Sequence, residues 1–112
     1  MKRAIVTGAS GNLGRAVTEQ LLVSGYQVAG TGLLPGAGES YMGAKIDLAD
    51  EAATYEWVSS VIQQGAVDTA VLTVGGFAMG DIASTPSGKI QEQINLNFMT
   101  AYHVARPVFL HM

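Results

Sequence analysis

The chain has 112 residues, of which 48% are hydrophobic and 13% charged, and its net charge is −3. This composition is typical of one folded domain and excludes a disordered chain. The six basic residues are scattered, so neither nucleic acid nor a membrane surface is an expected partner. Because the sequence has no cysteine, it has no disulfides or thiolate metal sites.

The N-terminus predicts no targeting segment. Only the apolar run 4–6 follows Lys2 and Arg3 before a glycine, which is too short for a signal-peptide core or a membrane span. We therefore expect a cytoplasmic protein. Glycine is unusually common, with 14 of 112 residues, which predicts many tight turns or close backbone approaches.

Strands and helices are predicted to alternate along the chain. Apolar runs, helical periodicity and glycine stops predict, in order, a strand over 4–6, a helix from Leu13 to Ser24-Gly25, a strand over 26–31, a loop over 32–43 and a strand over 44–46. Next come a helix that opens at Asp50-Glu51 and ends at Gly65, and a β-branched strand over 67–74. The last predicted element is a helix capped by Thr85-Pro86 that runs to the last residue. This order predicts a Rossmann-like α/β fold, a doubly wound parallel sheet of about four strands in a single domain over 1–112.

A glycine-rich turn lies between the first strand and the first helix. The segment Thr7-Gly8-Ala9-Ser10-Gly11-Asn12-Leu13-Gly14 has the spacing Gly-x-x-Gly-x-x-Gly in the context that dinucleotide binding requires. Gly8 permits the sharp turn, Gly11 lets backbone N–H groups approach a pyrophosphate, and Gly14 lets the helix pack closely on the sheet. The alternative is an ordinary turn between a strand and a helix.

This turn resembles the glycine motif of the short-chain dehydrogenase/reductase family. The match is to the Thr-Gly-x-x-Gly-x-x-Gly form of extended and atypical members, since Asn12 stands where classical members carry their middle glycine. The resemblance implies binding of NAD(P) by Thr7, Gly8 and Ser10 through Gly14. It also implies hydride transfer between the nicotinamide ring and a carbonyl or alcohol.

The family resemblance bears on the choice between NAD and NADP. Family members that use NAD carry an acid at the end of the second strand, where this chain has Gly32, and nearby basic residues favour NADP. With no carboxylate to repel a 2′-phosphate and with Arg15 in the first turn of the helix, NADP is weakly favoured. The alternative for Arg15 is a solvated helix residue.

Two further turns match the family in part. Asp47-Leu48 resembles the pair that contacts the adenine ring, with a capping aspartate as the alternative. Gly75-Gly76 follows the fourth strand where classical members have Asn-Asn-Ala-Gly, and the form is nearer that of dihydropteridine reductase-like members. Small residues there would let the backbone face the cofactor ribose, whereas the alternative is a plain turn.

The last helix carries a polar residue on its apolar side. At about 100° per residue, Asn97 falls in the middle of an apolar arc, so we expect it to be buried and to need hydrogen-bond partners. The arc comprises Ile90, Ile94, Ala101, Val104, Ala105, Val108 and Met112. The resemblance implies that Asn97 kinks the helix and orders a water of the proton relay, and the alternative is a core asparagine bonded to a neighbouring carbonyl.

The family's catalytic Ser and Tyr-x-x-x-Lys belong to a part of the fold that this chain does not match. In the Tyr-x-x-x-Lys at Tyr41–Lys45, Gly43 interrupts any helix and the chain continues as a strand, on which this spacing is about 13 Å, so we expect a chance recurrence. His103 and His111 have no acid or third histidine nearby and predict no metal site. We therefore expect a nucleotide-binding half that is inactive alone. A non-catalytic dinucleotide sensor and a ligand-free scaffold that self-associates through the last helix are the alternatives.

Overall fold

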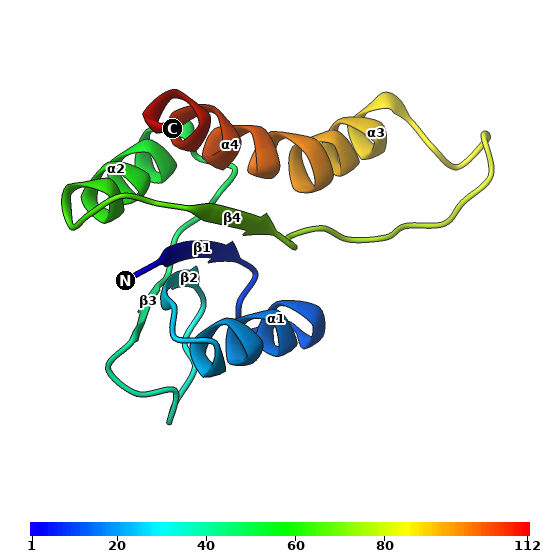
Figure 1. Ribbon diagram of the computed structural model, residues 1–112. Helices are drawn as coiled ribbons and strands as arrows, with labels where there is room; N and C mark the ends of the chain where they lie inside the picture. Colours follow the sequence, from blue (N-terminus) through cyan, green and yellow to red (C-terminus); the bar gives the residue numbers. More distant parts are fainter.

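The computed structural model describes all 112 residues as one four-stranded sheet with helices on both faces (Figure 1). All three pairings are parallel, in the order β3-β2-β1-β4, which confirms the Rossmann-like prediction. The elements are β1 (Arg3–Thr7), α1 (Asn12–Val23), β2 (Gln27–Thr31), β3 (Tyr41–Ala44), α2 (Glu51–Gln63), β4 (Thr69–Leu72), α3 (Ser87–Ile94), the π-helical turn η1 (Asn95–Met99) and α4 (Thr100–His111).

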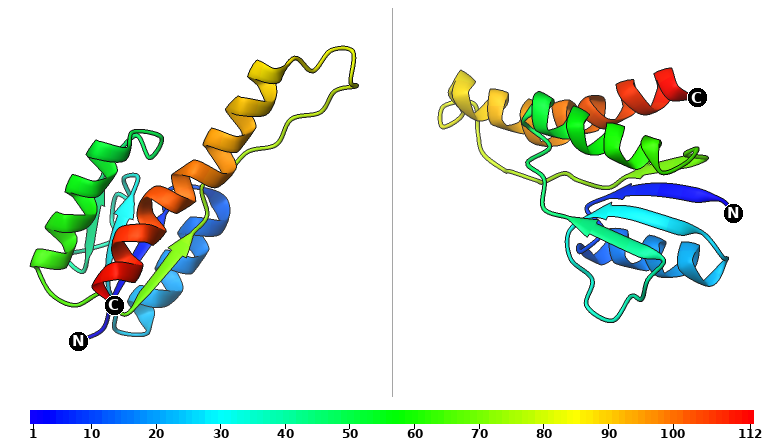
Figure 2. Two further views of the ribbon diagram at one scale, coloured as in Figure 1. Left: turned by 90° about the horizontal axis from the view of Figure 1, so that it is seen from above. Right: turned by 90° about the vertical axis from the view of Figure 1, so that its left-hand side faces the viewer.

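The helices form a layer on each face of the sheet. Helices α2 and α4 lie side by side on one face, and α1 covers the other (Figure 2). The larger core cluster lies under α2 and α4, and the smaller one, around Val6 and Val28, lies under α1. The larger cluster comprises Ile5, Ala29, Leu48, Trp57, Val58, Val61, Val67, Val104 and Val108. The central position of β1 explains why its residues 4–7 are all buried.

The third strand lies earlier than predicted. It spans Tyr41–Ala44 instead of 44–46, and it pairs in register with residues 28–31 of β2. Gly43 was expected to be loop, but a Cβ atom there would lie 2.7 Å from the Gly32 carbonyl oxygen, so this glycine allows close backbone approach within the sheet. Strand β4 is also shorter than predicted, at Thr69–Leu72 instead of 67–74.

The predicted cap of the last helix is shifted by one residue. Pro86, with extended backbone angles, is the N-cap, and the helix begins at Ser87. The Thr85 hydroxyl instead donates to the Asp81 carbonyl oxygen in the preceding turn. The prediction was wrong because the Thr85 hydroxyl is engaged in that turn and caps no N–H group of the helix.

The last helix is continuous but changes its pitch. It passes from α3 through the π turn η1 into α4 and ends at His111, one residue before the predicted end. Its N-terminal half projects beyond the sheet, and α3 has no buried residue (Figure 1). The predicted apolar arc is therefore only partly buried: Val104 and Val108 are buried, whereas Ile90 and Ile94 are exposed. No helix of the chain is both long enough and apolar enough to cross a membrane.

Candidate dinucleotide-binding site

The glycine-rich turn is held by hydrogen bonds to the end of β2. Gly8 N donates to the Thr31 hydroxyl at 2.8 Å, and Ala9 N donates to the Thr31 carbonyl at 2.9 Å. Gly11 N then donates to the Gly8 carbonyl at 3.0 Å, which closes the turn. Gly8 has φ +71°, a conformation that only glycine adopts without strain, as the sequence predicted for the sharp turn.

The first turn of α1 presents unpaired backbone donors. The N–H groups of Asn12, Leu13 and Gly14 have no acceptor in the structure, and the N-cap Gly11 supplies no side-chain bond. The first turn holds no acidic residue, so nothing competes at the positive end of the helix. Leu13 is 67% exposed beside these donors, because the helix buries Gly14 and Thr18.

The glycines of the turn have different steric surroundings. A Cβ atom at Gly14 would lie 1.9 Å from the Gly8 carbonyl oxygen, so only glycine lets the helix pack against the turn. A Cβ atom at Gly11 would meet only that same oxygen, at 3.4 Å, and would otherwise stand in open space. Gly14 therefore has a packing role, and the space over Gly11 is free for a ligand.

The end of β4 contributes a residue that the sequence did not reveal. The Thr73 hydroxyl donates to the Thr7 carbonyl at 2.7 Å, which ties β4 to β1 at the start of the glycine-rich turn. The same hydroxyl would lie 2.6 Å from a Cβ atom at Gly8. In the sequence, one signal could have indicated Thr73: it is a small polar residue at the end of a strand, just before Gly75-Gly76.

Gly32 lies directly beside the glycine-rich turn. Its φ is +107°, and a Cβ atom there would lie 2.4 Å from the Ser10 hydroxyl oxygen, so no side chain fits without a shift. The Tyr41 hydroxyl donates to the Gly32 carbonyl, and burial raises the pKa of this phenol. Tyr41 therefore has a structural role at the start of β3. Because it lies on a strand, Tyr41 and Lys45 do not have the i, i+4 spacing of two residues on one face of a helix.

A pocket of about 430 Å³ opens beside Asp47 and Leu48. The exposed Asp47 carboxylate accepts from Ala49 N at 3.0 Å, and Leu48 N has no acceptor in the structure. The Leu48 side chain is buried in the core and takes part in the larger cluster. The pocket is lined by Thr31, Ile46, Asp47, Leu48, Ala49, Val74, Glu92, Asn95, Leu96 and Thr100.

Asn97 lies within the π turn and contacts the end of β4. Its Oδ1 accepts from Gly76 N at 2.8 Å, and its Nδ2 donates to the carbonyl and side-chain oxygens of Gln93 at 3.0 and 3.1 Å. The expectation of a buried side chain was wrong, because this part of the helix lies beyond the sheet and Asn97 is exposed. The expected partners are nevertheless present, and the helix is deformed at this residue.

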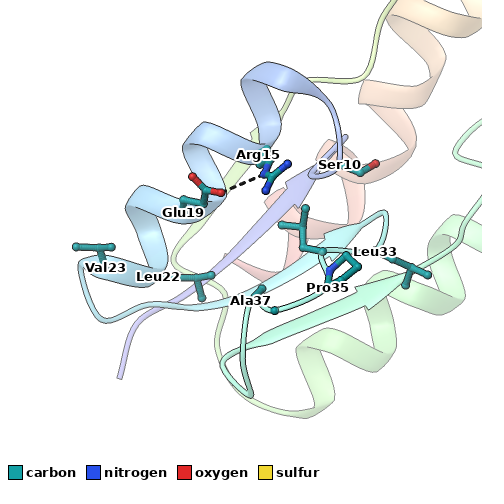
Figure 3. A pocket seen from close by; sticks show the side chains of 10 residues that line it. Ser10, Arg15, Glu19, Leu22, Val23, Leu33, Pro35 and Ala37 are labelled. Carbon is teal, nitrogen blue, oxygen red and sulfur yellow. Dashed lines mark hydrogen bonds and ion pairs between the residues drawn. The ribbon is translucent and has the colours of Figure 1, made fainter.

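A second pocket lies between α1 and the loop after β2. It has a volume of about 550 Å³, and Arg15 on its wall is paired with Glu19 at 3.1 Å (Figure 3). Both side chains are more than 60% exposed, so this ion pair adds little to stability. The lining residues are Ser10, Arg15, Glu19, Leu22, Val23, Leu33, Leu34, Pro35, Gly36 and Ala37.

No group of three or more His, Cys, Asp or Glu in the chain is placed to hold a metal ion.

His103 fixes the Asp47-Leu48 turn from α4. Its Nδ1 donates to the buried Leu48 carbonyl at 2.7 Å. We expect His103→Ala to lower the free energy of unfolding by about 2 kcal/mol, because it leaves that carbonyl without a donor. Urea denaturation measures this loss, with Arg106→Ala, an exposed neighbour, as the control that changes stability by less than about 0.5 kcal/mol. Equal losses for the two variants would contradict this role.

Comparison with known proteins assigns the chain to a family. The short chain dehydrogenase family model matches residues 2–112. The chain belongs to this family of oxidoreductases, and it corresponds to the nucleotide-binding half of the family fold.

Individual relatives are similar over almost all of this chain and about half of their own. The chain is 28% identical over 106 residues to the 3-oxoacyl-(acyl-carrier-protein) reductase MabA of Mycobacterium tuberculosis and of Mycobacterium bovis, covering 94% of this chain and 43% of theirs. A solved short-chain dehydrogenase/reductase of Serratia marcescens is 26% identical with a TM-score of 0.87, over 99% of this chain and 52% of that one.

Two structural neighbours at lower identity share the fold. Aldohexose dehydrogenase of Thermoplasma acidophilum, solved without ligand, has a TM-score of 0.88 at 23% identity, over 99% of this chain and 44% of that one. The 3-ketoacyl-(acyl-carrier-protein) reductase of Brucella melitensis, solved with NADH, has a TM-score of 0.88 at 18% identity, over 98% of this chain and 50% of that one.

Proposed function

We propose that residues 1–112 form one domain that binds NAD(P) across the carboxyl ends of β1, β2 and β4. The observation that carries this proposal is the set of unpaired N–H groups in the first turn of α1, under an open space that Gly11 leaves free. Such donors at the positive end of a helix suit a pyrophosphate. The residues present therefore fit the cofactor that the family uses.

The residues around the turn would hold the rest of the dinucleotide. Thr7, Gly8 and Ser10 shape the turn, and Asn12 through Gly14 donate to the phosphates. Asp47 and the Leu48 N–H would receive the adenine ring in the pocket of about 430 Å³. Gly75 and Gly76 would face a ribose. Asn97 would act by holding Gly76 in place, because its amide oxygen accepts from Gly76 N.

The same residues support binding without turnover. When bound, the cofactor supplies hydride chemistry at its nicotinamide ring. A general acid or base must lie within hydrogen-bond reach of the proton that it transfers. The only Tyr-x-x-x-Lys in the chain begins in β3, where the Tyr41 hydroxyl is bonded to Gly32. We therefore propose that these 112 residues hold the cofactor and do not transfer hydride on their own.

We propose NADP over NAD as the preferred cofactor. Gly32 stands where an acid would exclude a 2′-phosphate, and Ser10 occupies the space that any side chain there would need. The second pocket adds the Arg15 guanidinium beside this position. Phosphate is well suited to a guanidinium partner.

The NADP preference predicts a selective effect of Arg15→Ala. Removing the guanidinium is expected to weaken NADPH binding about fivefold and to leave NADH binding unchanged, since only NADPH carries the 2′-phosphate. An exposed charge pair of about 1 kcal/mol gives this factor. Fluorescence titration with both cofactors measures it, with Lys89→Ala on α3 as a control of equal charge change. Equal losses for NADPH and NADH would contradict the preference.

A titration of the purified chain tests the function itself. We expect NADPH to quench or shift the fluorescence of Trp57, or to show enhanced fluorescence of its own, in a saturable way. No oxidation of NADPH is expected with a panel of carbonyl compounds. An absence of binding at millimolar cofactor would refute the proposal and favour the ligand-free scaffold. Turnover of any carbonyl would refute the claim of binding alone.

The proposed partners are the dinucleotide and a second copy of the chain. The second copy would meet the last helix, whose exposed apolar residues include Phe98 at 60% and Phe109 at 77%. Such a surface on a small protein is typical of an interface. We propose the cytoplasm as the compartment, where NADP and NAD are present as free cofactors.

A further inference from the structure

The Tyr41 side chain fixes the peptide groups that follow β2. Its hydroxyl donates to the Gly32 carbonyl oxygen at 2.5 Å, and the Gly32 N–H donates to the Ala44 carbonyl oxygen at 2.8 Å. Both backbone polar groups of Gly32 are therefore held by residues of β3. Because burial raises the pKa of the Tyr41 phenol, the phenol keeps the proton that it donates at neutral pH.

Two paired glycines make room for the Tyr41 ring on the α1 face of the sheet. A Cβ atom at Gly30 would lie 2.6 Å from the Tyr41 hydroxyl oxygen, and one at Gly43 would lie 2.9 Å from the ring. Gly30 and Gly43 are register partners in β2 and β3, and the ring packs with the smaller core cluster under α1. A side chain at either glycine would displace the ring and take its hydroxyl away from Gly32.

The stability of the sheet does not account for this placement of the phenol. Glycine in a strand interior weakens the strand, because it has no side chain to pack and loses more conformational freedom on folding. Gly30 and Gly43 face each other here, and the Tyr41 hydroxyl adds only one hydrogen bond. The net contribution of a single hydrogen bond to stability is small. A function of Gly32 in the neighbouring site accounts for the arrangement better.

Gly32 joins two parts of the candidate site. Thr31, directly before it, accepts from two backbone N–H groups of the glycine-rich turn. Leu33, directly after it, begins the loop that forms one wall of the pocket of about 550 Å³, and Arg15 on α1 lies on the other wall (Figure 3). The backbone direction at Gly32 therefore sets where the loop wall stands relative to the Arg15 guanidinium.

We propose that Tyr41 is a positioning residue for the 2′-phosphate of NADPH. By holding the Gly32 carbonyl, it keeps the loop wall in place and the negative end of this peptide group away from the Arg15 pocket. Without the hydroxyl the carbonyl loses its donor, and glycine has the freedom to turn it toward the phosphate, which it would repel. This inference rests on the proposed binding of NADPH and adds a residue that determines the choice of cofactor.

Fluorescence titration of Tyr41→Phe with NADPH and NADH tests this role. The variant removes one hydroxyl oxygen and keeps the ring over its glycines. We expect NADPH affinity to fall about fivefold and NADH affinity to change by less than about twofold, because only NADPH carries the 2′-phosphate. Tyr26→Phe is the matched control, since Tyr26 packs in the same cluster and its hydroxyl is bonded to no residue of the chain. It should bind both cofactors as the wild type does.

A double variant distinguishes positioning from a general effect on the fold. In the Arg15→Ala background, Tyr41→Phe should weaken NADPH binding by less than about twofold, because the guanidinium that the pocket presents is already absent. Equal losses for NADPH and NADH, unchanged affinity for both, losses that multiply in the double variant, or a Tyr41→Phe chain that does not fold would overturn this role and leave the proposed function standing. A wild-type chain that binds neither cofactor would overturn both.

Discussion

Gly14→Ala is expected to abolish the stable fold of this domain. The added Cβ atom would lie 1.9 Å from the Gly8 carbonyl oxygen and 2.9 Å from the Thr73 hydroxyl. Because the first of these is a backbone atom, no change of rotamer relieves the contact, and α1 must move away from the sheet. We expect a loss of about 4 kcal/mol or more, most of the stability of a small domain. Thermal unfolding followed by circular dichroism measures it.

Gly88→Ala provides the matched control for this prediction. Gly88 lies in α3 with an ordinary backbone conformation, and a methyl group added there would have no neighbour within 4 Å. Alanine there should raise stability slightly, by about 0.5 to 1 kcal/mol, because it is the better helix former. If Gly14→Ala unfolded at the same temperature as Gly88→Ala, the packing assigned to Gly14 would be wrong.

Gly11→Ala is expected to remove cofactor binding while leaving the fold intact. Gly11 has φ −77°, which alanine adopts freely, and the new methyl group would touch only the Gly8 carbonyl at 3.4 Å. That methyl group would stand in the open space beside the unpaired donors of Asn12 and Leu13. We expect NADPH affinity to fall at least tenfold, equivalent to about 1.4 kcal/mol.

The comparison of these glycine variants separates packing from binding. Gly11→Ala should unfold within a few degrees of the wild type, whereas Gly14→Ala should not reach a folded state in which binding can be measured. Gly88→Ala should bind NADPH as the wild type does. Unchanged NADPH affinity in Gly11→Ala would show that the phosphates do not lie over this residue.

Much of the fold could be predicted from the sequence, because strong local signals coincide with it. The stop at Ser24-Gly25 and the helix opening at Asp50-Glu51 both lie where the structure has them, and Asp50 is the N-cap, whose side chain accepts from Ala53 N at 3.1 Å. The strands were less well bounded. Gly43 was expected to be loop, and only the register of β3 against β2 reveals that it lies in the sheet.

Features of the candidate site could be predicted where a single segment of the sequence contains the motif. They were missed where the site depends on contacts between segments far apart in the chain. The glycine-rich turn is local: Gly8 has the sharp-turn conformation and Gly14 the close packing that the motif predicts. The contact between Ser10 and Gly32, the tie from Thr73 and the bond from His103 to Leu48 each join distant parts of the chain. Spacing in the sequence carries no information about such contacts.

The expected burial of Asn97 failed for a physical reason of the same kind. Helical periodicity identifies which residues share a face, but it does not say how far the sheet extends beneath that face. The sheet ends near Thr100, which is buried, so the same face is buried at Val104 and exposed at Asn97. The π turn at this boundary has no signal in the apolar pattern.

Amide chemical shifts of the isotopically labelled chain, followed during an NADPH titration, test the central claim most directly. We predict that the largest changes fall on the amides of Asn12, Leu13 and Gly14, whose N–H groups have no acceptor in the free chain. Smaller changes should fall on Leu48 and Gly76. Saturable shifts confined to other parts of the chain, or no shifts at millimolar NADPH, would contradict binding of the dinucleotide at the glycine-rich turn.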